Sequence, residues 1–124
     1  MKAPADSTLQ SWWRRAVKTV QGSRCKVCGA EPVQIHHMVK RRRIQLKHDW
    51  RNGLPLCVEC HAGIDTIRGR AQVAQYLDME YLADRECTTF KNYLVKRGMT
   101  RAEFLTAQLD ELKAIVGDNR IPLL

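Results

Sequence analysis

Two cysteine pairs of the form Cys-x-x-Cys constrain the fold of this chain more than any other feature. Cys25 and Cys28 make the first pair, Cys57 and Cys60 make the second, and 28 residues separate them. Two residues between thiolates let a tight turn direct both sulfurs at one ion, and Gly29 suits the left-handed backbone of such turns. Four thiolates complete a closed tetrahedral site of the kind that structural zinc prefers. We therefore predict a structural zinc ion bound by all four cysteines.

A redox-active Cys-x-x-Cys is the main alternative to a zinc site. Such a pair normally stands alone after a strand in a thioredoxin-like pattern, which this sequence lacks. The zinc spacing by itself indicates little about function, because many non-enzymatic zinc ribbons share it. Function has to be inferred from the residues around the cysteines.

Two adjacent histidines, His36 and His37, lie near the end of a predicted short strand at residues 33–38. Adjacent strand residues point to opposite sides, so one imidazole can bind an ion while the other faces elsewhere. Residues 52–57 read as a turn followed by a second short strand, in which Pro55 predicts an edge position or a bulge. These segments predict a small pair of strands between the cysteine pairs.

A third histidine, His61, follows Cys60 directly, and Asp65 lies four residues further on. If the segment from Cys60 to about Ile67 is helical, His61 and Asp65 share one face of the helix. Two ligands at that spacing can bind one cation. An Asp in the first turns of a helix is often only a surface charge, so Asp65 stays an open candidate.

Three motifs follow one another in order: Cys-x-x-Cys at residues 25–28, then Ile35-His36-His37, then Asn52-Gly53-Leu54-Pro55-Leu56-Cys57-Val58-Glu59-Cys60-His61. In this order and spacing the chain resembles the HNH, or ββα-metal, endonuclease family over roughly residues 25–66. The resemblance implies that His36 and His61 are metal ligands and that Asp65 is a further ligand in some members. It also implies that His37 is the general base and that Asn52 orients this base or its loop.

The resemblance implies hydrolysis assisted by one catalytic divalent cation. A neutral imidazole with an ordinary pKa of about 6.5 can accept a proton from water at neutral pH. A divalent cation stabilises the charge that develops on the phosphate and on the leaving 3′ oxygen. Mixed histidine and carboxylate ligands accept Mg²⁺, Mn²⁺, Zn²⁺ or Ni²⁺, and the sequence does not choose among them. Loop 39–51 lacks the glycine that many family members have there, which leaves His48 as a spare site candidate.

The formal charge of +8 is concentrated in the first half of the chain. Residues 1–60 hold 12 Lys/Arg and 4 Asp/Glu, whereas residues 61–124 hold 9 of each. Such a balance favours a polyanionic partner, through phosphate contacts and counterion release. The basic loop, defined as Lys40, Arg41, Arg42 and Arg43, lies beside the predicted site. We expect it to hold DNA phosphates without reading bases, with a merely solvated loop as the alternative.

The expected fold class is α+β, with a two-stranded ββα-metal core and zinc knuckles. Residues 1–22 are expected to form an N-terminal segment and helix, 23–66 the HNH core, and 67–124 a helical extension, all in one compact domain. In the first helix, Trp12 and Trp13 are interpreted as core or interface anchors in preference to base-stacking residues.

Helical spacing predicts three helices in the C-terminal part. They are expected from Ala71 to about Asp84, from Thr88 to Lys96, and from Thr100 to Gly117, with lone Cys87 as a small buried hydrophobe. In the third helix Thr100 and Glu103 are expected to form the N-terminal cap. These helices also offer a surface through which a homodimer can form.

These features favour an HNH endonuclease that hydrolyses DNA phosphodiester bonds with little sequence specificity. Small size and basic charge resemble stand-alone HNH proteins of phages and prophages, which serve recombination or DNA processing. The main alternative is a non-catalytic zinc module that binds nucleic acid, and a weaker one is a zinc-ribbon adaptor for a protein partner. The N-terminus has no apolar signal segment and no apolar run approaches the ~20 residues that span a bilayer, so we expect a cytoplasmic protein.

Overall fold

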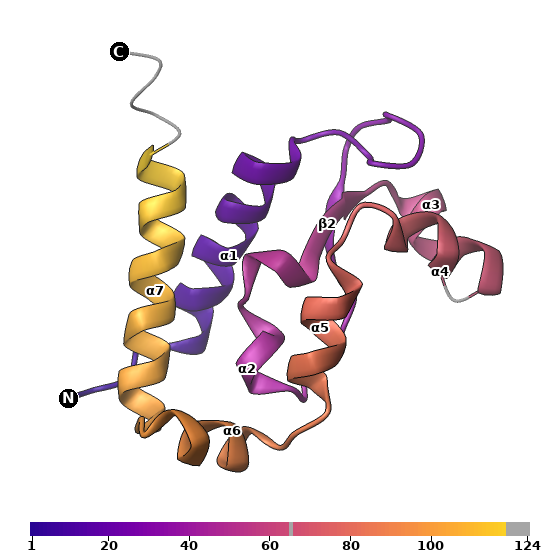
Figure 1. Ribbon diagram of the computed structural model, residues 1–124. Coiled ribbons are helices and arrows are strands. Elements are labelled where there is room, and N and C mark those ends of the chain that lie inside the picture. Colours follow the sequence, from indigo (N-terminus) through magenta and orange to yellow (C-terminus); the bar gives the residue numbers. More distant parts are fainter. Residues whose placement is uncertain (65, 119–124) are drawn as a thin grey trace.

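The fold is α+β, as expected: helices surround one antiparallel pair of strands (Figure 1). The computed structural model describes residues 1–64 and 66–118. In chain order the elements are α1 (Asp6–Gln21), β1 (Gln34–His37), α2 (Ile44–Lys47), the 3-10 helix η1 (Trp50–Asn52), β2 (Gly53–Leu56), α3 (Val58–Ala62), α4 (Ile67–Ala74), α5 (Met79–Glu86), α6 (Phe90–Arg97) and α7 (Arg101–Asp118).

The predicted pair of strands is confirmed to within a residue at each end. β1 and β2 run antiparallel, with Gln34 opposite Leu56 and His37 opposite Gly53. Pro55 is tolerated because each strand of a two-stranded sheet has a free edge, and its carbonyl accepts a hydrogen bond from the Lys26 N–H at 3.0 Å. This bond ties the first cysteine turn to the end of β2.

Helix α1 packs directly against the strands. At Gly53 an added Cβ would lie 2.7 Å from both the Trp13 ring and a Val17 methyl group, so only glycine permits this approach. Trp13 is fully buried, and its indole N–H donates to the Asp49 carbonyl at 2.8 Å. The interpretation of Trp13 as a core anchor is confirmed.

The apolar face of α7 is buried within the chain, against α1. Leu105, Leu112 and Val116 of α7 share one cluster with Leu9, Trp13, Ala16 and Val17 of α1. The two helices lie side by side in Figure 1. The structure therefore does not support the expected homodimer through the C-terminal helices.

The expected continuous helix from Ala71 to Asp84 is wrong, because the chain forms two short helices there. α4 ends at Ala74, and α5 begins after Asp78, whose carboxylate accepts a hydrogen bond from the Tyr81 N–H at 3.0 Å. An Asp cap starts a new helix here in preference to continuing the old one. Cys87 is exposed at the end of α5, so its expected burial is wrong too.

The other two C-terminal helices agree with the sequence. Thr89 caps α6, which ends at Gly98 in the left-handed conformation with φ of 63°. Thr100 and Glu103 form the expected reciprocal cap of α7. In the described part of the chain, no helix is long and apolar enough to cross a membrane.

His48 is buried beside α1, with 1% of its surface exposed. Neither ring nitrogen has a hydrogen-bond partner among the described residues, and Nε2 lies 3.6 Å from the Asp6 carboxylate. Burial lowers the pKa of His48 to about 4, although the Asp6 charge acts in the opposite direction. The folded protein therefore holds a neutral, buried imidazole at this position.

This imidazole should make folding stability depend on pH. Between about pH 6.5 and pH 4 the unfolded chain binds a proton at His48 that the folded protein does not, so stability falls as the pH drops through this window. Urea unfolding should show that His48→Leu removes about 2 kcal/mol of the stability difference between pH 7.5 and pH 5. An equal pH dependence in both proteins would contradict this account.

Candidate metal centre and active site

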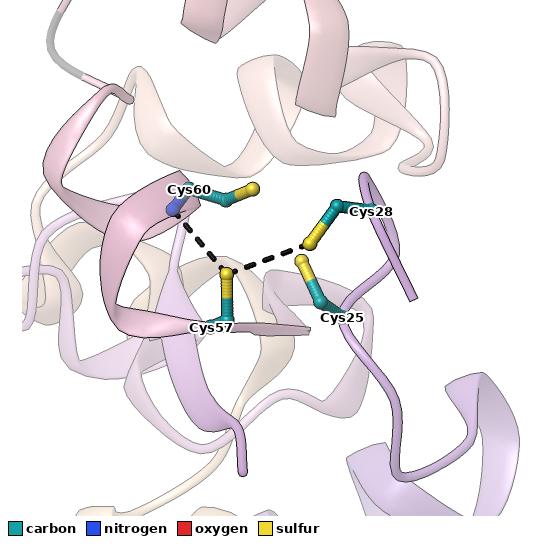
Figure 2. A group of neighbouring side chains, drawn as sticks. All are labelled: Cys25, Cys28, Cys57 and Cys60. Carbon is teal, nitrogen blue, oxygen red and sulfur yellow. Dashed lines mark hydrogen bonds between the residues drawn. The ribbon is translucent and has the colours of Figure 1, made fainter. Parts of the chain in front are cut away.

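The four cysteines of the two pairs converge on one point (Figure 2). Their sulfurs all lie within 4.8 Å of one another, and the Cys28 and Cys57 sulfurs are 3.6 Å apart. Four sulfurs ~2.3 Å from a tetrahedral ion lie about 3.8 Å from one another. The cluster therefore fits zinc, and its four ligands leave no coordination position for substrate.

Local backbone structure aims the four sulfurs. In the first turn, the Gly29 N–H donates to the Cys25 carbonyl at 2.8 Å, with Gly29 in the expected left-handed region at φ of 78°. In the second, Cys57 is the N-cap of α3, and its sulfur accepts a hydrogen bond from the Cys60 N–H at 3.5 Å (Figure 2). The second turn therefore points an N–H group at a sulfur, and backbone N–H groups of Val27 and Cys28 do the same for Cys25 in the first turn.

The thiols of the cluster affect one another's ionisation. Burial opposes ionisation of Cys25, but backbone N–H donors from Cys57 and Cys28 outweigh it and lower the pKa of Cys25 to about 6. Burial and the neighbouring thiols raise the pKa of Cys60 well above its ordinary value. A single thiolate thus suppresses ionisation of its neighbours, so four thiolates require a bound cation.

Two histidine rings meet where β1 faces α3. The Nδ1 atom of His36 lies 3.0 Å from the Nε2 atom of His61, with the ring centroids 4.7 Å apart. Two ring nitrogens ~2.1 Å from one ion and at a right angle to each other lie about 3.0 Å apart. The pair therefore fits two positions in the coordination sphere of a divalent cation. Both residues were predicted from the sequence as ligands of such a cation.

Gln34 orients His61 and was not found by sequence reasoning. Its Oε1 lies 3.1 Å from His61 Nδ1, so an Nδ1–H donated to Gln34 turns the His61 Nε2 lone pair toward His36 Nδ1, where it can accept a hydrogen bond or bind an ion. Gln34 and His36 are two residues apart on β1, and alternate strand residues share a face. That alternation was the signal which could have identified Gln34.

His37 faces away from this pair and lies against α1. Its ring stacks on Trp13 with centroids 3.9 Å apart and an angle of 9° between planes. Its Nε2 lies 2.8 Å from the Lys47 carbonyl oxygen, so Nε2 carries the proton and Nδ1 holds the lone pair. Burial lowers the pKa of His37 to about 4, which makes this imidazole neutral.

Asn52 is fully buried and uses its whole side chain to hold the loop between the strands. Its Nδ2 donates to the carbonyls of Val39 and Leu46, each at 3.0 Å, and its Oδ1 accepts from the Val39 N–H at 2.6 Å. The same loop carries the Lys47 carbonyl that fixes His37. Asn52 thus holds this loop, and its part in the chemistry stays a prediction from the resemblance.

The two remaining site candidates are Asp65 and His48. α3 ends at Ala62, and a turn follows at Gly63 and Ile64. The helix predicted from Cys60 to about Ile67 is therefore interrupted. Asp65 itself lies outside the described residues. His48 faces Asp6 beside α1, which favours its packing role.

The basic loop (Lys40 to Arg43) lies beside His37. Lys40, Arg41 and Arg42 are exposed, and in the described part of the chain no residue of the loop forms an ion pair. The positive charge of Arg41 is close enough to contribute to the lowered pKa of His37. Phosphates drawn to this loop would therefore approach the His37 side of the site.

Comparison with known proteins identifies the class of this core. Residues 25–64, about a third of the chain, match the model of the HNH endonuclease family. The match includes all four clustered cysteines together with His36, His37, Asn52 and His61. The resemblance seen in the sequence is thereby confirmed over this span. Members of the family generally hydrolyse nucleic acids, although some are non-catalytic. Searches of curated proteins and of solved structures found no match to the chain.

Proposed function

We propose that this protein is a metal-dependent endonuclease that cleaves DNA phosphodiester bonds with little sequence specificity. The observation that supports this most is the 3.0 Å approach of the His36 and His61 ring nitrogens next to a neutral His37. This arrangement supplies two ligands and one basic nitrogen from adjacent elements. Asp65 is the proposed further ligand, from the resemblance alone. A role in phage recombination or DNA processing stays a prediction.

The chemistry follows from the positions of these side chains. His36 and His61 would hold a divalent cation, which supplies charge stabilisation at the scissile phosphate and the leaving 3′ oxygen. His37 would take a proton from the attacking water on Nδ1, because its Nε2 proton is engaged by the Lys47 carbonyl. The water oxygen bonds to phosphorus, the bond to the 3′ oxygen breaks, and solvent protonates that oxygen. Asn52 acts as a positioning residue by holding the loop that carries Lys47.

A non-catalytic zinc module is the second candidate. The stacking of His37 on Trp13 is the observation that favours it, since a ring packed this closely also serves as a core side chain. Both candidates predict zinc and nucleic-acid binding. Only the first requires a second cation at His36 and His61.

Replacing His61 tests for the second cation directly. His61→Ala should lower the affinity for Mn²⁺ or Ni²⁺ at least about 100-fold and abolish DNA cleavage, while the tightly bound zinc remains. Calorimetry and zinc analysis measure the two sites separately. Gln34→Leu should give an intermediate loss of about 10-fold in affinity, because it removes only the hydrogen bond that orients His61.

Glu59→Ala is the matched control, since Glu59 is an exposed residue of the same helix. It should leave metal affinity and cleavage unchanged. Unaltered binding of the second cation by His61→Ala would exclude the proposed ligand pair.

The basic loop should dominate DNA affinity. Replacing Arg41, Arg42 and Arg43 together by alanine should weaken binding to any duplex about 10- to 100-fold near 0.15 M salt, because three phosphate contacts are lost. The slope of log affinity against log salt should fall by about 2–3. A triple alanine variant of the exposed Lys91, Lys96 and Lys113 has the same change in charge and should bind almost normally. If the two triple variants weaken DNA binding equally, the basic loop contributes only through the net charge of the protein and makes no specific phosphate contacts.

A further inference from the structure

A cavity of about 370 Å³ opens on a side of the protein that the proposed chemistry does not use. Side chains from α2, η1, α5, α6 and α7 line it, and none of the cysteine or histidine ligands does. Its volume lies within the range of about 300–1,000 Å³ that is typical of small-molecule sites. It therefore has room for a ligand of moderate size.

Two buried acceptors in residues that line this cavity lack a partner within the described part of the chain. Gln45 is 1% exposed and Gln108 is 8% exposed, and the Oε1 of each has no hydrogen-bond partner among the described residues. The Gln45 amide cannot be reversed, because its Nε2 donates to the carbonyls of Arg85 and Thr88 at 3.0 and 2.8 Å. Buried acceptors without partners cost free energy. A ligand with N–H groups would satisfy the Gln45 oxygen, and the Gln108 amide, whose orientation no hydrogen bond among the described residues fixes, can present its oxygen to a second N–H.

Two arginines that line the same cavity each stack their guanidinium group against a tyrosine ring. Arg85 lies 3.8 Å from the centre of the Tyr81 ring and Arg97 lies 4.5 Å from the centre of the Tyr93 ring. Stacking holds each guanidinium in place while its N–H donors stay available. In the described residues Arg97 has no ion pair, and Arg85 has only a long one of 3.9 Å.

A third arginine, Arg51, forms ion pairs with the two carboxylates that line the cavity. Arg51 lies 3.1 Å from Asp49 and 3.6 Å from Glu111. Asp49 also accepts the Tyr81 hydroxyl at 2.5 Å. The cations of Arg85 and Arg97 are thus left to meet an anion in the same cavity that Gln45 and Gln108 line.

We propose that this cavity binds a nucleotide, with the phosphate at Arg85 and Arg97 and the N–H edge of the base at Gln45 and Gln108. Inorganic phosphate supplies the anion without N–H donors, and a polyamine supplies donors but repels the arginines. A nucleotide carries both groups on one rigid frame. A free nucleotide and an unpaired nucleotide of DNA share this chemistry. The proposal does not depend on cleavage at the histidine site.

Calorimetry without divalent cations tests the site. Deoxyadenosine monophosphate should bind at least about tenfold more tightly than either inorganic phosphate or deoxyadenosine. Arg97→Gln should weaken this binding about 10-fold or more, and Gln108→Leu about 5-fold. Lys96→Gln, a neighbouring exposed residue that does not line this cavity, should have no effect. Thermal melting of each variant checks the fold.

Competition then identifies the source of the nucleotide. If DNA with an unpaired adenine displaces the mononucleotide and Arg97→Gln weakens both, the ligand belongs to DNA. Failure of that DNA to displace it means that the site takes free nucleotides. The proposal is overturned if the mononucleotide does not bind, binds no better than phosphate, or binds equally well to both cavity variants.

Discussion

Zinc removal by a strong chelator is expected to unfold the core between residues 23 and 66 and to lower the melting temperature by at least ~15 °C. Cys25 and Cys57 are members of the core cluster that also contains Leu54 and Leu56 of β2. Without a cation, the neighbouring thiols suppress ionisation of Cys60, and the tetrahedral link between the two cysteine turns is lost. Hydrogen exchange should show lost protection in β1 and β2 first, since α1 and α7 form a separate apolar cluster.

Cysteine variants provide the matched comparison. Cys57→Ser should lose zinc and melt early, whereas Cys87→Ser should keep about one zinc ion per chain and a normal melting temperature, because Cys87 is exposed outside the cluster. An unchanged melting temperature after verified loss of zinc would show that these sulfurs do not hold the fold.

His37→Ala is expected to reduce DNA cleavage by about 10²- to 10⁴-fold, with DNA affinity preserved. The loss follows from removing the basic nitrogen, because no other histidine in the described residues stacks at this place between Trp13 and the Lys47 carbonyl. Rates of plasmid nicking under single-turnover conditions measure the effect.

The alanine variant also leaves a gap beside Trp13, so a packing control is needed. His37→Phe keeps a ring to stack on Trp13 and has no basic nitrogen. It should stay folded, with a loss of about 1–3 kcal/mol in stability from the unpaired Lys47 carbonyl, and remain inactive. Cleavage by His37→Phe at the rate of the unaltered protein would rule out His37 as the general base.

The spacing of chemical groups along the chain predicted the cluster of four sulfurs and the two strands well. Cysteine turns are set by local backbone geometry, so Cys-x-x-Cys with Gly29 was sufficient to predict the sulfur cluster. The alternation of strand residues likewise predicted that His36 and His37 face different elements. These features depend on residues that are close together in the chain, so they can be predicted from a single sequence.

Features that depend on contacts between residues far apart in the chain could not be predicted from the sequence. The stacking of Trp13 on His37 joins α1 to β1. The hydrogen bond from His37 goes to the backbone carbonyl of Lys47, and every residue type has such a carbonyl, so the sequence does not identify it. The break before α5 depended on Asp78 acting as a cap inside an apolar pattern that suited a continuous helix. The arginine cavity likewise arises only when α5, α6 and α7 come together.

Incubation of supercoiled plasmid with the purified protein tests the central claim most directly. Parallel reactions would contain EDTA, Mg²⁺, Mn²⁺, Ni²⁺ or Zn²⁺, with a gel-shift assay on the same DNA. The endonuclease account predicts nicked plasmid with at least one divalent cation and none with EDTA. A clear gel shift without nicking in any metal would contradict it and establish the chain as a zinc-containing module that binds DNA.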